Sequence, residues 1–269
     1  MNKLHKGMGI DQQGVTGMGT QSDLVVYEKI DKTACITLND PKTNNALTSG
    51  LIRRLRDVWV DFESDPEMRV AILTGRGKAF CTGMDLEEAE SGLIADFDSC
   101  MPNIGVEVSK PIIGAINGWA VGAGMGLAVC TDIRVMSETA KFLFPEAKFG
   151  YAGGGLDFIR DMPYAVAMEI WLTGEPLDAK RAYEIGLVNR VVPPEQLMKE
   201  ATRFADIIRE NAPLTMKMLK MSAVMQTTNV KTGWLMLKST YIKPQAESED
   251  LQEGIRASKE KRKPEFKGK

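Results

Sequence analysis

Between Lys110 and Asp132 lies a run of 21 residues, Pro111 to Thr131, without a charged side chain. A run of this length is long enough to suggest a membrane-spanning helix. It contains Pro111, Asn117 and five glycines, however, which break it into shorter pieces that do not suit a single lipid-facing helix. The run is therefore predicted to be a buried core segment, and no membrane span is expected.

This uncharged run divides into three predicted pieces. Residues 111–117 are apolar and short, which favours a buried strand. Residues 118–126 contain too many glycines for the interior of a strand or a helix, so they predict a turn, and residues 127–131 begin or continue a buried helix. A glycine-rich turn that opens a helix presents unpaired backbone N–H groups, which favour a negatively charged oxygen in front of them.

A carboxylate follows this run at a position where it could meet the turn. A second strand-like segment, residues 140–144, leads to Glu146 and then to another glycine-rich turn, residues 150–155. A carboxyl group in an apolar pocket has a raised pKa, so that it can take up and return a proton near neutral pH. The alternative is that Glu146 is an ordinary surface carboxylate after Pro145.

The N-terminal part of the chain predicts a hairpin followed by a capped helix. Residues 24–30 and 33–38 have the composition of two strands, joined by a turn at residues 31–32. Thr48 is placed to cap a helix over residues 49–63, in which apolar side chains recur at three- and four-residue spacing.

Strands and helices alternate along the rest of the chain. Residues 70–74 are continuously apolar, which is typical of a strand in a parallel sheet buried on both faces. Helices alternating with such strands predict a right-handed α/β arrangement. Further helices are predicted at residues 178–186, 194–209, 214–225 and 250–262. The methionines at positions 216, 218, 221 and 225 are expected to fill core space. The charged last helix, residues 250–262, is expected to be a solvated end.

The composition excludes several classes of protein. With 269 residues, 43% of them hydrophobic, the chain can bury one large core. Its 34 Lys and Arg residues balance 36 Asp and Glu residues, which argues against a general nucleic-acid binder. The four cysteines include no C-x-x-C pair, so neither a disulfide framework nor a metal site is expected. A reducing cytoplasm is the simplest compartment.

Several short motifs, in order along the chain, resemble the crotonase superfamily, the enoyl-CoA hydratase/isomerase enzymes. The central match runs from Ala115 to Asp132 and continues through Lys141-Phe142 to Phe144-Pro-Glu146. The resemblance extends from about residue 24 to the end of the chain. The further matching segments are Asn45-Ala-Leu47, Ala71-Ile-Leu-Thr-Gly75, Lys78-Ala-Phe-Cys-Thr-Gly-Met-Asp-Leu86, residues 167–174 and residues 182–192.

The resemblance implies a fold and an assembly. The expected fold is α/β, a crotonase-like spiral of β-β-α turns with a C-terminal helical trimerisation region. The chain then divides into a flexible leader over residues 1–22, the spiral core over residues 23–195 and the C-terminal helical region over residues 196–269. A homotrimer or a dimer of trimers is expected, with no nucleic-acid or membrane partner.

By position, the resemblance also implies an oxyanion hole. Met84 and Ala123 stand where the family holds two backbone N–H donors. Chemistry next to a thioester pushes negative charge onto its carbonyl oxygen, and one fixed donor of this kind stabilises the transition state by about 3 kcal/mol. The alternative is that both turns only reverse the chain. Substrate-binding residues are expected around these positions at Gly83, Asp85, Gly122, Gly126 and Tyr151.

The acidic residues bear on the reaction. Family hydratases use two glutamates that hold and activate water, and here Gly126 occupies the first position and Glu146 the second. A single carboxylate suits a double-bond shift, in which one group removes a proton and returns it elsewhere. Water addition stays open if another group orients the water, for which Tyr151, Asp157 and Asp161 are candidates, although packing is the commoner role for a residue such as Tyr151.

The resemblance and the acidic residues together leave two classes of function. The first is an acyl-CoA enzyme that catalyses reversible hydration or a double-bond shift, with coenzyme A as part of the substrate and no separate cofactor or metal. The second is a catalytically weak protein of the same fold that binds acyl-CoA or a partner. The acyl group is not determined, although Leu93, Phe97 and Met101, in the variable region 87–108, are candidates to line its pocket.

Overall fold

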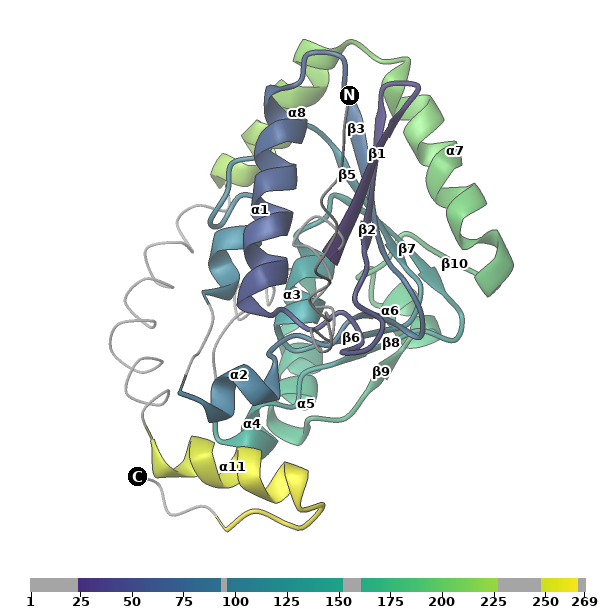
Figure 1. Ribbon diagram of the computed structural model, residues 1–269. Coiled ribbons are helices and arrows are strands. Elements are labelled where there is room, and N and C mark those ends of the chain that lie inside the picture. The colour runs from purple at the N-terminus through teal and green to yellow at the C-terminus, as the bar shows by residue number, and fades with distance from the viewer. Residues whose placement is uncertain (1–23, 93–95, 152–160, 227–247, 266–269) are drawn as a thin grey trace, which may run out of the picture.

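The computed structural model describes residues 24–92, 96–151, 161–226 and 248–265. In these residues the elements form two sheets flanked by helices (Figure 1). In chain order the elements are β1 Val25–Ile30, β2 Thr33–Leu38, α1 Ser49–Ser64, β3 Val70–Gly75, β4 Ala79–Cys81, α2 Leu86–Glu90, η2 Phe97–Cys100, β5 Ile112–Ile116, β6 Trp119–Val121, α3 Ala123–Val129, β7 Ile133–Ser137, β8 Lys141–Leu143, α4 Glu146–Phe149, α5 Tyr164–Thr173, β9 Leu177–Asp178, α6 Ala179–Glu184, β10 Arg190–Val192, η4 Pro194–Gln196, α7 Leu197–Arg209, α8 Pro213–Gln226 and α11 Glu249–Lys259.

From β3 to β8 the strands alternate between the two sheets, which produces a spiral. The larger sheet has the order β1-β2-β3-β5-β7-β10, and the smaller has the order β4-β6-β8-β9. The chain passes from β3 to β4, from β5 to β6 and from β7 to β8, and a helix, α2, α3 or α4, follows each pair. Pairing is parallel from β2 through β10 in the larger sheet. The predicted α/β spiral of β-β-α turns is therefore confirmed.

β3 shows why this sheet needs uninterrupted apolar strands. Ala71 and Leu73 belong to the main hydrophobic core, whereas Val70 and Ile72 pack with the buried face of α7 on the opposite side. Successive strand side chains point to opposite faces, so a strand covered on both sides must be apolar at every position. Figure 1 shows α1 and α7 on opposite sides of this sheet.

Two local predictions near the N-terminus are confirmed. Asp31 and Lys32 both have positive φ angles, 46° and 64°, as expected for a two-residue turn that joins twisted antiparallel strands. The Thr48 side chain accepts a hydrogen bond from the Leu51 N–H at 3.2 Å and caps α1.

The glycine-rich segment 118–126 was predicted to be a strand-to-helix turn, and this prediction is right only in part. Part of it forms strand β6, and α3 begins within it at Ala123. A Cβ atom at Gly118 would lie 2.0 Å from the Lys78 carbonyl oxygen, and one at Gly124 would lie 2.2 Å from that of Cys81. These glycines therefore allow β6 and α3 to approach the backbone next to β4, a long-range requirement that the local pattern does not reveal.

Two predictions for the C-terminal helices are also wrong, the first of them only in part. Met216 packs against a core cluster as expected, but Met218 is 73% exposed, and Leu214 and Leu219 on α8 are exposed as well. Conversely, α11 is not a solvated end, because Leu251 and Ile255 are fully buried. Their apolar partners come from distant parts of the chain and are absent from the helix's own sequence pattern.

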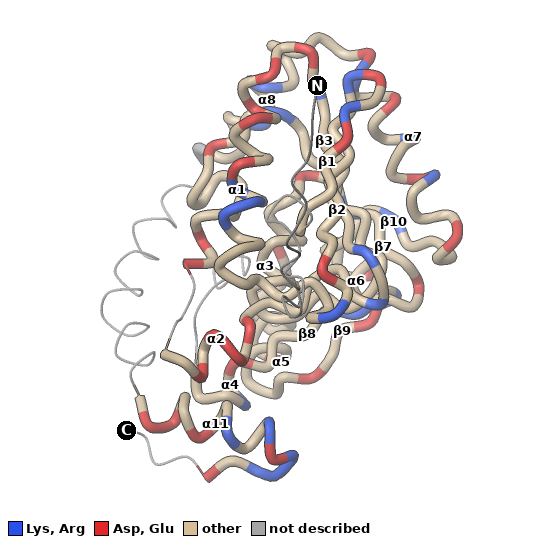
Figure 2. The backbone as a smooth tube through the Cα atoms, in the orientation of Figure 1, with Lys and Arg blue, Asp and Glu red and all other residues tan. Residues whose placement is uncertain are grey.

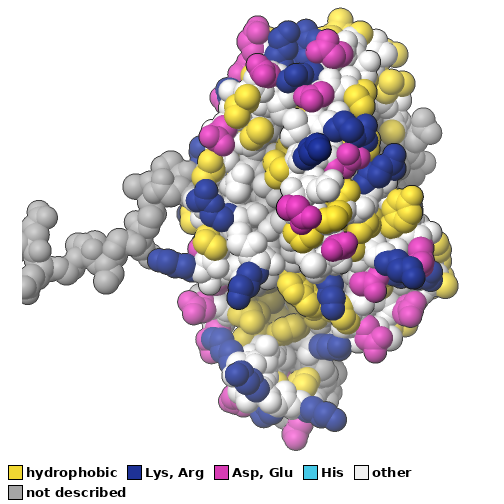
Figure 3. Space-filling model, turned by 90° about the vertical axis from the view of Figure 1, so that its right-hand side faces the viewer, with side chains coloured by type: hydrophobic (Ala, Val, Ile, Leu, Met, Phe, Trp, Pro, Cys, Tyr) yellow, Lys and Arg dark blue, Asp and Glu magenta, His cyan; other side chains and the backbone are white. Residues whose placement is uncertain are grey.

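Most charged side chains lie on the outside of this fold, and Lys110, Lys220 and Glu253 are buried exceptions. Figure 2 shows Lys, Arg, Asp and Glu on the outer helices and loops, while β3, β5 and α3 carry none. On the face drawn in Figure 3, side chains of both signs are interspersed with hydrophobic ones, without a continuous basic surface. Among the described residues, no helix combines the length and apolarity needed to cross a bilayer.

Several sequence predictions involve residues or side chains that the structure does not describe. They concern the leader, residues 1–22, residues 152–155 of the second glycine-rich turn, and the side chains of Leu93, Asp157 and Met225. The expected boundary at residue 195 falls within η4, and α7 directly after it packs on the larger sheet.

Candidate active site

The turn after β4 lies directly against the start of α3. Gly83 has a φ angle of 74°, and a Cβ atom there would lie 2.5 Å from the Val121 carbonyl oxygen and 3.1 Å from the Ala123 nitrogen. Because Met84 follows Gly83, the two backbone N–H groups expected to form an oxyanion hole come from adjoining turns. Within the described parts of the chain, neither N–H donates a hydrogen bond, so both are available to a substrate oxygen.

Glu146 lies beside the second of these turns. A Cβ atom at Gly122, whose φ angle is 53°, would lie 2.5 Å from Glu146 Oε1, so the carboxyl group rests on the Gly122 backbone next to Ala123. Glu146 Oε2 is buried and has no hydrogen-bond partner among the described residues. The prediction that turn and carboxyl group meet is confirmed.

The environment of Glu146 favours its protonated form. Burial raises the pKa of Glu146 well above its usual range, and a hydrogen bond from its own backbone N–H offsets this only in part. A carboxyl group with a raised pKa can gain and lose a proton near neutral pH, as a general acid or base must. The surface-carboxylate alternative for Glu146 is therefore not what the structure shows.

Asp85 and Gly126 have structural surroundings that account for them. Asp85 caps α2, where its Oδ1 accepts hydrogen bonds from the backbone N–H groups of Glu87 at 3.1 Å and Glu88 at 2.8 Å. Gly126 is buried inside α3, and its N–H donates to the Gly122 carbonyl oxygen at 3.0 Å. A substrate-binding role for either residue stays a prediction.

Tyr151 is buried, and its surroundings match a packing residue. It contacts apolar side chains of α2 and α11, and its backbone N–H donates to the Glu146 carbonyl oxygen at 3.1 Å. Burial raises the pKa of Tyr151 to about 12, and the negative charges of Asp98 and Glu146 add to this rise. The Tyr151 hydroxyl therefore stays protonated across the physiological pH range.

Sequence reasoning did not find two parts of this site. Asp98, in η2, is close enough to act electrostatically on the Tyr151 hydroxyl, although nothing in the variable region 87–108 singles it out. The second part is α11, which packs on α4 and α2. The candidate pocket residues Phe97 and Met101 are buried in the main core, and Asp161 precedes α5.

Known proteins with similar sequences match most of this chain. Residues 28–269 match the family model described as enoyl-CoA hydratase/isomerase. The chain is 35% identical over 255 residues to (E)-benzylidenesuccinyl-CoA hydratase of Thauera aromatica, covering 91% of this chain and 99% of the relative. It is 36% identical over 246 residues to carnitinyl-CoA dehydratase of Proteus mirabilis, covering 87% and 94%.

Solved structures show the same fold. EchA1_1 from Mycobacterium paratuberculosis has a TM-score of 0.83 to this chain at 33% identity, covering 92% of this chain and 99% of the other. A carnitinyl-CoA hydratase from Mycobacterium avium has a TM-score of 0.82 at 32% identity, with the same coverage. The similarity thus extends over nearly the whole length of both proteins.

Proposed function

Because this chain belongs to the enoyl-CoA hydratase/isomerase family, we propose that Met84, Ala123 and Glu146 form its active site. The function is of the acyl-CoA hydratase/isomerase type. The observation that carries the assignment of the site is the position of the Glu146 carboxyl group against Gly122, beside two N–H groups that donate no hydrogen bond within the described residues.

The two N–H groups bind the carbonyl oxygen of the thioester. When a proton leaves the carbon next to this carbonyl, or a nucleophile adds to the conjugated double bond, negative charge moves onto the oxygen. Donors already held in place need no reorganisation when this charge develops, and each contributes about 3 kcal/mol to stabilising the transition state. The close packing of Gly83 on the Ala123 nitrogen supports a fixed distance between the donors.

We propose that the principal reaction is reversible hydration of a 2-enoyl-CoA. In the addition direction, Glu146 removes a proton from water as the water oxygen bonds to C3, and Glu146 then returns this proton to C2 of the resulting enolate. Three relatives support reversible hydration by their names, since two are called hydratases and one, carnitinyl-CoA dehydratase, is named for the reverse reaction. The raised pKa of Glu146 supports its role in moving the proton.

A double-bond shift is the second candidate, and Gly126 is the observation that favours it. Gly126 brings no second carboxyl group to the site, so Glu146 acts alone. In this reaction Glu146 takes a proton from C2 of a 3-enoyl-CoA, the double bond moves into conjugation with the thioester, and the proton returns to C4. No water is consumed.

Incubation with enoyl-CoAs in D₂O separates these reactions. Hydration in D₂O adds one D₂O across the double bond, with the oxygen at C3 and deuterium at C2, whereas isomerisation adds no oxygen and exchanges hydrogen for deuterium at C2 or C4. Straight-chain, branched and cyclic substrates, analysed by mass spectrometry, also test the range of acyl groups. Absence of both reactions, with retained acyl-CoA binding, would instead support the binding-protein alternative.

We further propose a homotrimer or a dimer of trimers, and a cytoplasmic location. The exposed apolar side chains Leu214, Met218 and Leu219 on α8 support a contact with another copy of the chain. None of the four cysteines, all of which lie in the described residues, forms a disulfide bond, which supports a reducing compartment. Light scattering of the native protein and of Met218→Glu tests the assembly, since a charge at a buried contact should shift the mass toward the monomer.

A further inference from the structure

Helix α11 lies across both elements that carry the proposed catalytic groups. It packs on α4, whose first residue is Glu146, and on α2, which begins two residues after Met84. Figure 1 shows α11, in yellow, along the side of the molecule where α2 and α4 lie together. The oxyanion turn and the carboxylate therefore share one neighbour from a distant part of the chain.

The contact between α11 and α4 is made by backbone. A Cβ atom at Gly254 would lie 2.2 Å from the Phe149 carbonyl oxygen, and one at Gly150 would lie 2.9 Å from the Asp250 carbonyl group. Such distances leave no room for a side chain at either glycine, so a larger residue at either position would push the two helices apart. Because α4 has only four residues, it depends on such contacts for its position.

The contact between α11 and α2 is made by side chains. Leu251 and Ile255 of α11 form a small apolar cluster with Ala89 of α2 and with Tyr151, and Met84 packs against this cluster. Lys259, the last residue of α11, forms an ion pair with Glu90 at the end of α2. One helix thus contacts both halves of the site.

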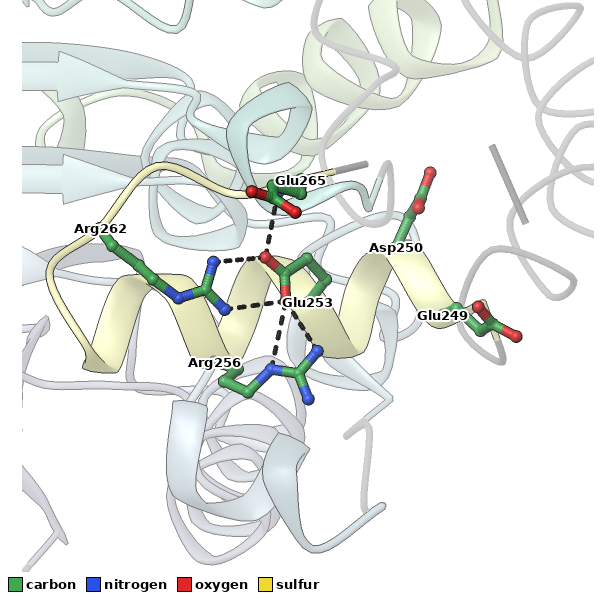
Figure 4. A pocket seen from close by; sticks show the side chains of 6 residues that line it. All are labelled: Glu249, Asp250, Glu253, Arg256, Arg262 and Glu265. Atoms are coloured by element: carbon green, nitrogen blue, oxygen red, sulfur yellow. Dashed lines mark hydrogen bonds and ion pairs between the residues drawn. The ribbon is translucent and has the colours of Figure 1, made fainter. Parts of the chain in front are cut away.

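A buried glutamate fastens the segment after α11 back onto the helix. Glu253 is only 8% exposed, and its Oε1 accepts hydrogen bonds from Arg262 Nη1 at 2.6 Å and from the Glu265 N–H at 3.0 Å. Its Oε2 accepts from Arg256 Nη2 at 2.7 Å and from Arg262 Nη2 at 2.9 Å. Figure 4 shows these bonds converging on Glu253 at the edge of a surface pocket.

We propose that α11, fastened by Glu253, sets the distance between the Met84 N–H and the Glu146 carboxyl group, and that Glu253 and Gly254 are positioning residues of the active site. This inference rests on the proposed function. Its physical basis is that catalysis needs the acid and the oxyanion donors in a fixed relation, and a misplacement of about 1 Å can slow a reaction on the order of 100-fold.

Two variants test whether α11 and Glu253 position the active site in this way, with a matched control on another helix. Glu253→Gln removes the charge that holds Arg262, and Gly254→Ala pushes α11 away from Phe149. The control is Glu200→Gln, because Glu200 binds Arg203 through two hydrogen bonds on α7, away from the site. We expect kcat to fall about tenfold in Glu253→Gln and more in Gly254→Ala, with little change in the affinity for a saturated acyl-CoA.

Two further readouts distinguish positioning from loss of stability. In Glu253→Gln, the pH profile of kcat/KM should shift toward lower pH as water reaches Glu146, and Glu253→Asp should recover part of kcat. Hydrogen exchange, measured without substrate, should accelerate in residues 86–90 and 146–150 of Glu253→Gln but not of Glu200→Gln. If Gly254→Ala does not fold, the measurements on Glu253→Gln alone decide whether α11 positions the catalytic groups.

The positioning role of Glu253 would be contradicted if Glu253→Gln had the same kcat, pH profile and exchange rates as the parent protein. Inactivity of the parent protein toward every enoyl-CoA would instead contradict the proposed function, and the exchange measurement would still decide whether Glu253 holds α2 and α4 in place.

Discussion

Two glutamates on neighbouring helices, Glu146 on α4 and Glu253 on α11, have opposite surroundings. Glu146 has one buried oxygen without a hydrogen-bond partner among the described residues, and its pKa is raised by burial. Glu253 accepts hydrogen bonds from two arginines and a backbone N–H, with Arg262 contributing most to the lowering of its pKa. The same side chain is therefore kept ready for proton transfer in one region and kept permanently charged in the other.

This difference has a structural meaning. A carboxylate saturated with donors stabilises one arrangement of the chain, which suits a residue that fastens α11. A carboxyl group left short of donors is poor for stability but can exchange a proton with a substrate, which suits a catalytic residue. The two regions meet where α11 packs on α4, so changes at either glutamate test the comparison.

The largest effect is expected from Glu146→Gln. The amide keeps the shape of the side chain but cannot take up a proton, so the rate with any enoyl-CoA substrate should fall on the order of 100- to 10,000-fold. Steady-state kinetics measure this loss, and binding of a saturated acyl-CoA should be nearly unchanged. Retention of most of the activity would mean that another group moves the proton.

A smaller but still large effect is expected from Gly122→Ala. The added Cβ atom would lie 2.5 Å from Glu146 Oε1 and must displace the carboxyl group. We expect a fall in kcat on the order of 100-fold, as for a misplaced catalytic group. The matched control is Gly92→Ala, because Gly92 also has a positive φ angle, 86°, but a Cβ atom there would meet nothing within 4 Å. Equal kcat losses in both variants would point to backbone strain as the cause.

The two glutamates should also give opposite pH dependences of stability. Glu146 has a raised folded-state pKa, so its favourable contribution is present below the unfolded pKa of about 4.3 and is lost as pH rises through the folded value. Glu253 has a lowered pKa, so its contribution is present above about 4.3 and is lost as pH falls through its folded value.

Thermal unfolding of the two glutamine variants measures this difference. At pH 8, Glu146→Gln should be more stable than the parent protein and Glu253→Gln less stable. Both stability differences should shrink as the pH is lowered. The difference for Glu146→Gln should shrink first, once the pH falls below the raised pKa of Glu146. A destabilised Glu146→Gln at pH 8 would contradict the burial of an uncompensated carboxylate.

The smallest effect is expected from Tyr151→Phe. The ring keeps its contacts with α2 and α11, and only the protonated hydroxyl is lost. Loss of a general acid or base typically lowers the rate by roughly 100-fold or more, and we expect kcat to fall far less than this in Tyr151→Phe. A loss of that size in steady-state assays would instead assign Tyr151 a direct role, with Asp98 as its electrostatic neighbour.

The parts of this fold that could be predicted are those with local causes. The hairpin turn at residues 31–32, the Thr48 cap and the apolar strand at residues 70–74 each depend on a few consecutive residues. The glycines at 118 and 124 were misinterpreted because each is required by a carbonyl group of another segment. α11 was misinterpreted because its apolar face is matched to Ala89 and Tyr151, which its own pattern does not contain.

The residues alone established which groups this chain can bring to a reaction: a carboxyl group at position 146, none at position 126, and small residues beside both proposed donors. The resemblance carried by ordered motifs added the family and the register of the site. Only the folded chain decided that one carboxyl oxygen of Glu146 is buried without a hydrogen-bond partner among the described residues and that α11 contacts both halves of the site. Desolvation and close backbone approach depend on which distant atoms become neighbours, and no local pattern of residues contains that information.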